Sequence, residues 1–202
     1  MRGFKRYMLG VIVLSGLWAG CASTKVTRVQ VEKPIDLSGQ WNDYDGRLVS
    51  QEVIKNCLEA PWLTNFMKEK GRNPVVIVGH VENRSHEHIN TRVFTTHLEK
   101  ELINSGKVIF VASPEERVEI RQEREDQHQG YTDRVTMAEI GKERGADYML
   151  IGSVNSVKDE VKGKYAILYQ VNFELIHLTT NEKSWIGQKE IKKMVENAKF
   201  SL

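Results

Sequence analysis

The stretch that decides the fold is residues 165–175, which have the sequence YAILYQVNFEL. Bulky apolar residues occupy every second position of it: Tyr165, Ile167, Tyr169, Val171, Phe173 and Leu175. Because successive side chains of a strand point to opposite faces, this alternation predicts a strand with one buried face and one wet face. Tyr165 and Tyr169 share the apolar face, which favours the core, although two tyrosines could also be exposed anchors at an interface.

A second stretch, Pro74-Val75-Val76-Ile77-Val78-Gly79, is an almost continuous β-branched run. Such a run is typical of a strand that is buried on both faces. Working outward from these two stretches, the pattern predicts further strands at 108–111, 148–154 and 183–187. The last three strands follow one another directly, so they are expected to form an antiparallel meander.

Capping residues and apolar periodicity predict five helices among these strands. The first runs to about residue 58, can be capped by Asp43 or Asp45, and turns Leu48, Ile54 and Leu58 inward. The others are expected at 61–70 before Gly71, from Asn90 or Thr91 to Gly106, at 114–128 after Ser113, and at 136–144 before Gly145. The order of elements predicts an α/β domain: a mixed β-sheet flanked by helices, with a C-terminal antiparallel three-strand meander.

Composition favours one ordinary globular domain. The chain has 202 residues, of which 40% are hydrophobic and 28% charged. Its formal net charge of +2 comes from the N-terminus, where Arg2, Lys5 and Arg6 stand without an acidic residue in positions 1–20. The rest of the chain is nearly neutral, which disfavours electrostatic capture of a polyanion, so no nucleic-acid partner is expected.

Residues 1–20 have the layout of a bacterial secretory signal, with a basic start followed by the uncharged stretch 7–18. The segment ends in Ala19-Gly20-Cys21, which resembles a lipoprotein signal. In such signals the cysteine is lipidated and becomes the mature N-terminus, so Cys21 is the expected lipidation site. The alternative is an ordinary cleaved signal with Cys21 incidental. A short tether is then expected at 21–35, a globular domain at 36–193 and a polar tail at 194–202.

The sequence carries no familiar catalytic signature. It has no Gly-rich phosphate loop, G-x-S-x-G elbow, CxxC pair or HExxH helix. Cys57 falls on the apolar side of a predicted helix, which favours a small buried side chain over a nucleophile. The best metal candidates are His80, His86, Glu87, His88 and His97, but these residues fit a hydrogen-bonded loop and a helix face equally well. We therefore expect neither an enzyme nor a metal or other cofactor.

A series of short segments runs through the rest of the chain. They are LSGQWND at 37–43, NCL at 56–58 with Pro61-Trp62, VIVG at 76–79, VENRS at 81–85, HINT at 88–91, NSGKV at 104–108, EREDQ at 123–127, GADYML at 145–150, YQV at 169–171 and WIGQKEIKK at 185–193. Taken together and in this order, they resemble the penicillin-binding protein activator lipoproteins of the LpoB type. The resemblance covers residues 36–193, although the segment 145–150 also occurs in the TolB N-terminal domain and the curli secretion lipoprotein.

This resemblance implies a fold similar to the TolB N-terminal domain. It implies an outer-membrane lipoprotein that faces the periplasm, held to the membrane by the lipid on Cys21. The implied partner is a bifunctional class A penicillin-binding protein, which such proteins activate without being catalysts themselves. The best-known members carry a long Pro-rich tether, whereas the tether here has about 14 residues and reaches about 50 Å when fully extended.

The expected partner-binding residues are those of the polar loop after the first strand: Asn83, Arg84, Ser85, His86, Glu87 and His88. A loop between a buried strand and a capped helix is a place where a rigid scaffold presents variable chemistry. Alternatively, Asn83 and Asn90 could merely close a turn and cap a helix. Two other functions remain open: an envelope secretion or assembly lipoprotein related to the curli secretion lipoprotein, and a periplasmic ligand or metal sensor built on the histidines.

Overall fold

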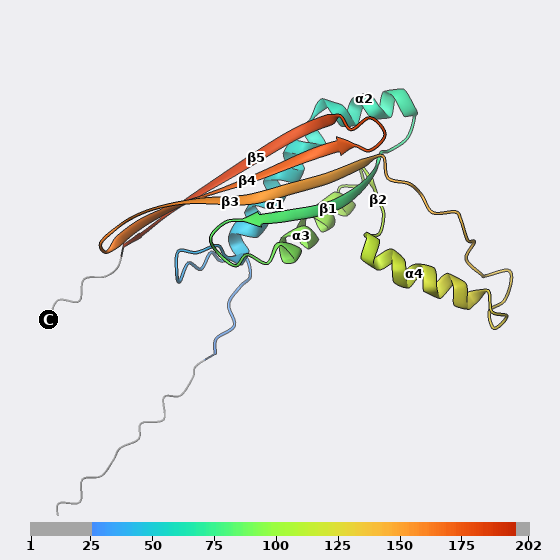
Figure 1. Ribbon diagram of the computed structural model, residues 1–202, viewed down its shortest axis with the longest axis horizontal. Coiled ribbons are helices and arrows are strands. Elements are labelled where there is room, and N and C mark those ends of the chain that lie inside the picture. Colours follow the sequence, from blue (N-terminus) through green and yellow to red (C-terminus); the bar gives the residue numbers. More distant parts are fainter. Residues whose placement is uncertain (1–25, 197–202) are drawn as a thin grey trace, which may run out of the picture. The chain divides into compact units, whose positions relative to one another are not determined.

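A computed structural model describes residues 26–196. The chain divides into a unit that ends at Val31, in which residues 26–30 have no regular secondary structure, and a body that begins at Glu32. The expected signal and Cys21 lie outside the described residues. The elements of the body, in chain order, are α1 (Asp43–Glu59), α2 (Pro61–Lys70), β1 (Val75–Arg84), α3 (Thr91–Asn104), β2 (Ile109–Phe110), α4 (Pro114–Gln127), β3 (Tyr148–Val161), β4 (Lys164–His177) and β5 (Lys183–Glu196) (Figure 1).

The five strands form one sheet in the order β2-β1-β3-β4-β5. β1 pairs in parallel with β2 and β3, whereas β3 with β4 and β4 with β5 are antiparallel. The predicted mixed sheet with its C-terminal meander is therefore confirmed. Each meander strand covers 14 residues, which is longer than the sequence pattern indicated. Residues 194–196 belong to β5 and not to a polar tail, because their pairing with β4 continues to Lys164; residues 197–202 lie outside the described range.

One face of the sheet is buried beneath helices. The five apolar side chains of β4 from Ile167 to Leu175 are at most 2% exposed, which confirms the alternation predicted for this strand. Tyr169 is fully buried in the core, whereas Tyr165 at the far end of the strand is only partly buried. α1 packs on β5, α3 packs on β1 and β2, and the two helices contact each other (Figure 1).

The helix starts show why one predicted cap is wrong. The side chain of Asn42 caps α1 by accepting a hydrogen bond from the backbone N–H of Asp45, and the Asp45 carboxylate accepts one from the backbone N–H of Asn42. This reciprocal pair makes Asn42 the N-cap, one residue before the helix begins at Asp43. Neither Asp43 nor Asp45 is therefore the cap. Leu48, predicted to point inward, is 38% exposed because the helix turns its neighbour Val49 to the core. Asn90 caps α3, as one of the two alternatives predicted.

β1 is buried on both faces where the sequence predicted it. Val75, Val76, Ile77 and Val78 are all at most 5% exposed. The strand then continues to Arg84, well past Gly79, with a shift in its register against β3 between Val78 and Val81.

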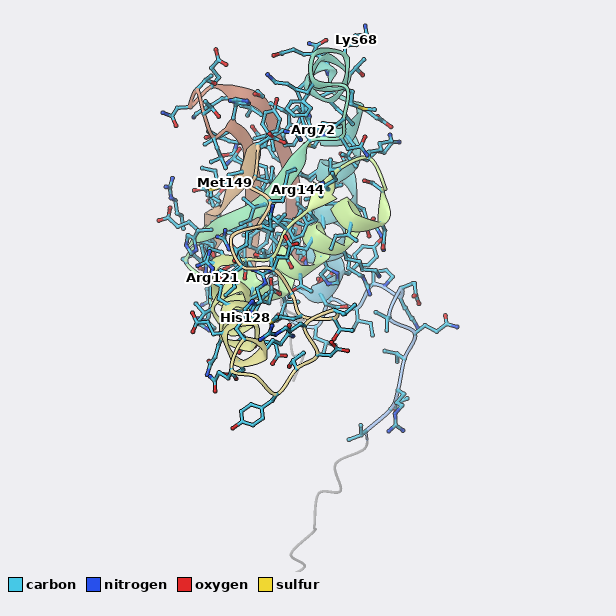
Figure 2. All side chains as sticks on the ribbon, turned by 90° about the vertical axis from the view of Figure 1, so that its right-hand side faces the viewer. Lys68, Arg72, Arg121, His128, Arg144 and Met149 are labelled. Atoms are coloured by element: carbon cyan, nitrogen blue, oxygen red, sulfur yellow. The ribbon has the colours of Figure 1, made fainter. Side chains whose placement is uncertain are left out.

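The structure also differs from the prediction in the segment between α4 and β3. α4 is present as predicted, but the helix expected at 136–144 is not formed, and residues 128–147 return to the sheet without one (Figure 2). Gly141 has a φ of 77°, a left-handed conformation that a helix cannot contain, and Ile140 is 60% exposed with no surface to pack on. The Glu143 carboxylate instead pairs with Arg121 and Arg124 of α4, and these two guanidinium groups lower the pKa of Glu143 to about 2.

The segment before α1 is fastened to the meander by one buried lysine. The Lys193 ammonium of β5 lies 2.6 Å from both the Asp36 and the Asp45 carboxylates, and it also donates to the backbone carbonyl of Gln40. The Lys193 and Asp45 side chains are only 10% and 5% exposed. The Tyr165 hydroxyl adds a bond to the backbone carbonyl of Ser38. The chain is therefore attached to the body from Asp36 onward.

Replacing Lys193 is expected to destabilise the body strongly. Lys193→Ala leaves the buried Asp45 carboxylate without its cation, which costs about 3–5 kcal/mol for a buried ion pair. Lys183→Ala is the matched control in the same strand, because Lys183 is 53% exposed and pairs with Glu174, so its loss costs at most about 1 kcal/mol. Urea unfolding of the two variants measures both values, and equal losses would contradict this role for Lys193.

Candidate functional site

The expected polar loop is shorter than predicted. Glu82, Asn83 and Arg84 are the last residues of β1, where they pair with Ser153 to Asn155 of β3. Only Ser85 to Asn90 connect β1 to α3. The six predicted site residues, Asn83 to His88, thus span the end of a strand and the first part of a tight connection.

Two of the six residues close the connection on itself. The Asn83 amide donates to the backbone carbonyl of Glu87 at 2.8 Å and accepts from the backbone N–H and the hydroxyl of Ser85. The Ser85 hydroxyl also lies 3.2 Å from the backbone N–H of Glu87 and accepts its hydrogen. These contacts match the alternative in which Asn83 closes a turn. They hold the connection in one conformation.

Glu87 anchors the connection to the rest of the body. Its carboxylate accepts a short hydrogen bond from the Tyr169 hydroxyl and a 3.0 Å bond from the backbone N–H of Trp41. The Trp41 ring packs edge-on against Tyr169 and Phe94, with ring centroids 5.4 and 6.2 Å apart. Burial and the bond to Glu87 both raise the pKa of the Tyr169 hydroxyl, which keeps it a donor at neutral pH. Each carboxylate oxygen of Glu87 thus accepts a hydrogen bond from within the body.

The other three residues face solvent. Arg84 forms an exposed ion pair with Glu82 at 2.6 Å. His86 is tied to β3, because its ring Nδ1 lies 2.8 Å from the Ser156 hydroxyl and its backbone N–H donates to the same oxygen. His88 is exposed. Arg84, His86 and His88 are thus polar groups presented from a fixed backbone, which is what a contact surface requires.

A hollow of about 400 Å³ opens beside these residues. It is lined by Gln40, Trp41, His86, Glu87, His88, Ile89, Lys158, Tyr165 and Ile167. The Lys158 ammonium lies 4.7 Å from the centre of the Tyr165 ring and pairs with Glu160. Lys158 and Tyr165 come from the adjacent strands β3 and β4, and the fastening of residues 36–41 brings the distant Trp41 beside them. The sequence named Tyr165 as a possible interface anchor, but no local signal placed Trp41 beside it.

The histidines do not form a metal site in the part of the chain that the structure describes. Within residues 26–196 no three His, Cys, Asp or Glu side chains gather closely enough to hold an ion. Cys57 is 1% exposed, and burial raises the pKa of its thiol to about 12, which confirms the prediction of a small buried side chain. The exposed polar groups of the stretch from Asn83 to His88 are Arg84, His86 and His88.

Comparison with known proteins found one matching family model and several similar solved structures. The family model described as the peptidoglycan-synthase activator LpoB matches residues 45–191, from the first turn of α1 into β5. No curated protein sequence matches the chain significantly.

Several solved structures are similar to the chain. The LpoB C-terminal domain from Salmonella enterica has 22% identity and a TM-score of 0.41, covering 73% of this chain and 98% of that one. The NMR structure of E. coli LpoB has 19% identity and a TM-score of 0.41, covering 90% and 86%. Lipoprotein GNA1162 from Neisseria meningitidis has 12% identity and a TM-score of 0.36, covering 64% and 88%.

Removing the Glu87 carboxylate is expected to destabilise the body. Glu87→Ala leaves the buried Tyr169 hydroxyl and the Trp41 N–H without an acceptor, at about 1–3 kcal/mol for each group. Glu87→Gln keeps an acceptor oxygen and should lose less. Urea unfolding followed by tryptophan fluorescence measures the difference, with the exposed Glu82→Ala as control.

A second substitution separates the hydrogen bond from other effects of Glu87. Tyr169→Phe removes the hydroxyl that Glu87→Ala would leave unsatisfied, so the double variant should lose less stability than the sum of the two single losses. Strict additivity would show that Glu87 does not act through Tyr169.

Proposed function

The chain belongs to the family of the peptidoglycan-synthase activator LpoB, and from this premise we propose that it binds and activates a bifunctional class A penicillin-binding protein. The observation that carries the proposal is the extent of the family match, which takes in nearly every element of the body. The family is one of regulatory activators, so the chain acts on a catalyst and is not itself one.

Activation of this kind is a problem of binding equilibrium. The body docks on a part of the synthase away from its active sites and shifts it toward the active conformation. The shift in this equilibrium is limited by the difference between the affinities of the body for the active and the inactive conformation. A rigid contact surface suits this role, because ordering the activator on binding would lower its affinity for the synthase.

The contact surface proposed is the end of β1 and the connection after it. Arg84, His86 and His88 are its exposed groups, and Asn83, Ser85 and Glu87 position them from beneath. Arginine is enriched among residues that dominate binding energy at interfaces. The neighbouring hollow, with Lys158 and Tyr165 in its wall, offers room for a side chain of the synthase.

The family and the lipoprotein-like N-terminal sequence support a proposal for the location. We place the protein at the outer membrane on its periplasmic face, held by lipid on Cys21. Among residues 26–196 no helix has both the length and the apolar content that a bilayer crossing needs.

The contact surface is tested by a double substitution, Arg84→Ala with His86→Ala. Both side chains are exposed, so the loss of stability should stay within about 0.5 kcal/mol per site. If they are central contacts, affinity for a purified class A penicillin-binding protein should fall by about 1–2 kcal/mol, or roughly 5- to 30-fold. Binding and glycan polymerisation are measured at two salt concentrations, since a charged rim contact alone would fade with salt.

Lys68→Ala is the matched control for charge. It removes one exposed cation from α2, at the other end of the sheet (Figure 1), and should leave binding and stimulation unchanged. Equal affinity and equal stimulation by the double variant would show that the connection is only the entry to α3, and the interface would then be sought on α4 or on the open face of the meander.

Lipidation is tested by Cys21→Ser. Without the thiol no lipid can be attached, so the variant should keep its signal or become soluble, and it should lose the mass of the lipid. Fractionation and mass spectrometry of the envelope measure this, with Cys57→Ser as control for an unrelated thiol. Unchanged fractionation and mass in Cys21→Ser would rule out lipidation.

A further inference from the structure

One edge of the sheet is incomplete. β1 has ten residues, but β2 pairs only with the first two of them, Val75 and Val76. Figure 1 shows β2 leading away from β1 toward α4, while β1 continues. Among the described residues no strand pairs with this side of β1 beyond Val76.

Backbone groups of β1 face this edge at regular intervals. The Val76 carbonyl points toward β2, because it accepts from the backbone N–H of Val111. The backbone N–H and C=O groups of successive residues in a strand point to opposite sides, so those of Val78 point to the same side as those of Val76. The extra residue at the register shift before Val81 turns Val81 to this side as well. Val78 and Val81 therefore offer donors and acceptors to a further strand.

The opposite edge of the sheet is protected and this one is not. Besides the buried Lys193, β5 carries the lysines Lys183, Lys189 and Lys192 along its length. Lysines on an edge strand are a common defence against pairing with another chain. Residues 78–83 of β1 contain neither lysine nor proline. The stretch therefore lacks these two defences, and a guest strand has to follow the register shift between Val78 and Val81.

A groove runs along the unprotected edge. It has a volume of about 540 Å³ and is bounded by Val78 to Val81 of β1, by α3 and by the start of α4. Thr91, Thr95 and Thr96 of α3 contribute to one wall, and Ser113 and Pro114 to the other.

The groove carries more negative than positive charge. Glu99, Glu115 and Glu116 line it, against Arg92 and the imidazole of His80. Burial and the nearby Glu116 raise the pKa of the Glu99 carboxyl, and Arg92 offsets them only in part. The Glu99 and Glu116 carboxylates repel each other, and a second cation beside them would relieve this repulsion. The negative charge of the groove therefore favours a basic peptide.

We propose that the edge of β1 from Val78 to Val81 is a docking site for one extended peptide segment that carries a lysine or arginine. The segment takes the place beside β1 that β2 leaves free, and its backbone pairs with Val78 and Val81 in the manner of strand addition. Its basic side chain lies against Glu99 and Glu116. This surface is separate from the contact surface at Arg84 to His88 and does not depend on it.

The experiment selects the guest from a display library of random twelve-residue peptides, using the full-length chain as bait. Peptides that are enriched should contain a lysine or arginine, and the best of them is synthesised for titration. Thr95→Trp fills the groove and should weaken binding at least tenfold, whereas Val93→Trp, on α3 outside the groove lining, should not. Glu99→Gln with Glu116→Gln should also weaken binding, while Glu119→Gln, on α4 outside the groove lining, should have no effect.

Two further measurements identify the mode of binding. Saturating peptide should slow amide hydrogen exchange at Val78 and Val81 at least tenfold, because both amides become hydrogen-bonded. A peptide N-methylated at alternate amides keeps its side chains but loses donors, and it should not bind. The proposal is overturned if no peptide is enriched, if Thr95→Trp binds the peptide as tightly as the unaltered chain, or if exchange at Val78 and Val81 is unchanged.

Discussion

The sheet has one face that must be kept from water, and that requirement places the two helices α1 and α3. Along β4 the apolar side chains from Ile167 to Leu175 all point to this face and are almost completely buried. α1 and α3 cover it and pack against each other above it. The segment before α1 is held by Lys193 on the same face. The other face of the meander carries amides and charges, such as Asn172 and Gln188, which need no cover.

Glu87 shows how this buried face supports an exposed surface. Its carboxylate lies at the border of the core, where the Tyr169 hydroxyl and the Trp41 backbone both bind it. The residues on either side of it in the chain, His86 and His88, are exposed as a result. A polar anchor in the core therefore fixes the direction of polar groups outside it, at little cost in entropy when a partner binds. The edge of β1 differs, because there the backbone itself is the available binding group.

Sequence patterns predicted the elements with strong apolar periodicity. They failed where the local structure depends on packing or pairing partners far away in the sequence. The alternation along 165–175 and the β-branched run at 75–78 are confirmed because burial is their direct cause. The helix expected at 136–144 had local propensity but no apolar surface to cover, so Gly141 and exposed Ile140 remain in a loop. The loop expected from Glu82 is partly strand, since β3 supplies a pairing partner that lies some seventy residues later. The candidate contact residues Arg84, His86 and His88 could be named from the sequence, whereas Trp41 comes to the neighbouring hollow only through tertiary structure.

The parallel pairing of β1 with β3 determines the order in which the body can be completed. Val76 and its partner Tyr148 are 72 positions apart, whereas the meander is built from neighbours joined by short turns. A chain made or exported from its N-terminus delivers α1, α2, β1 and α3 first, and none of them has a sheet to cover until β3 and β4 follow. Closing so long a loop is slow compared with forming a hairpin. While the chain is incomplete, the apolar residues of β1 therefore lack their partner strand, and the last third of the chain is the part that completes the sheet.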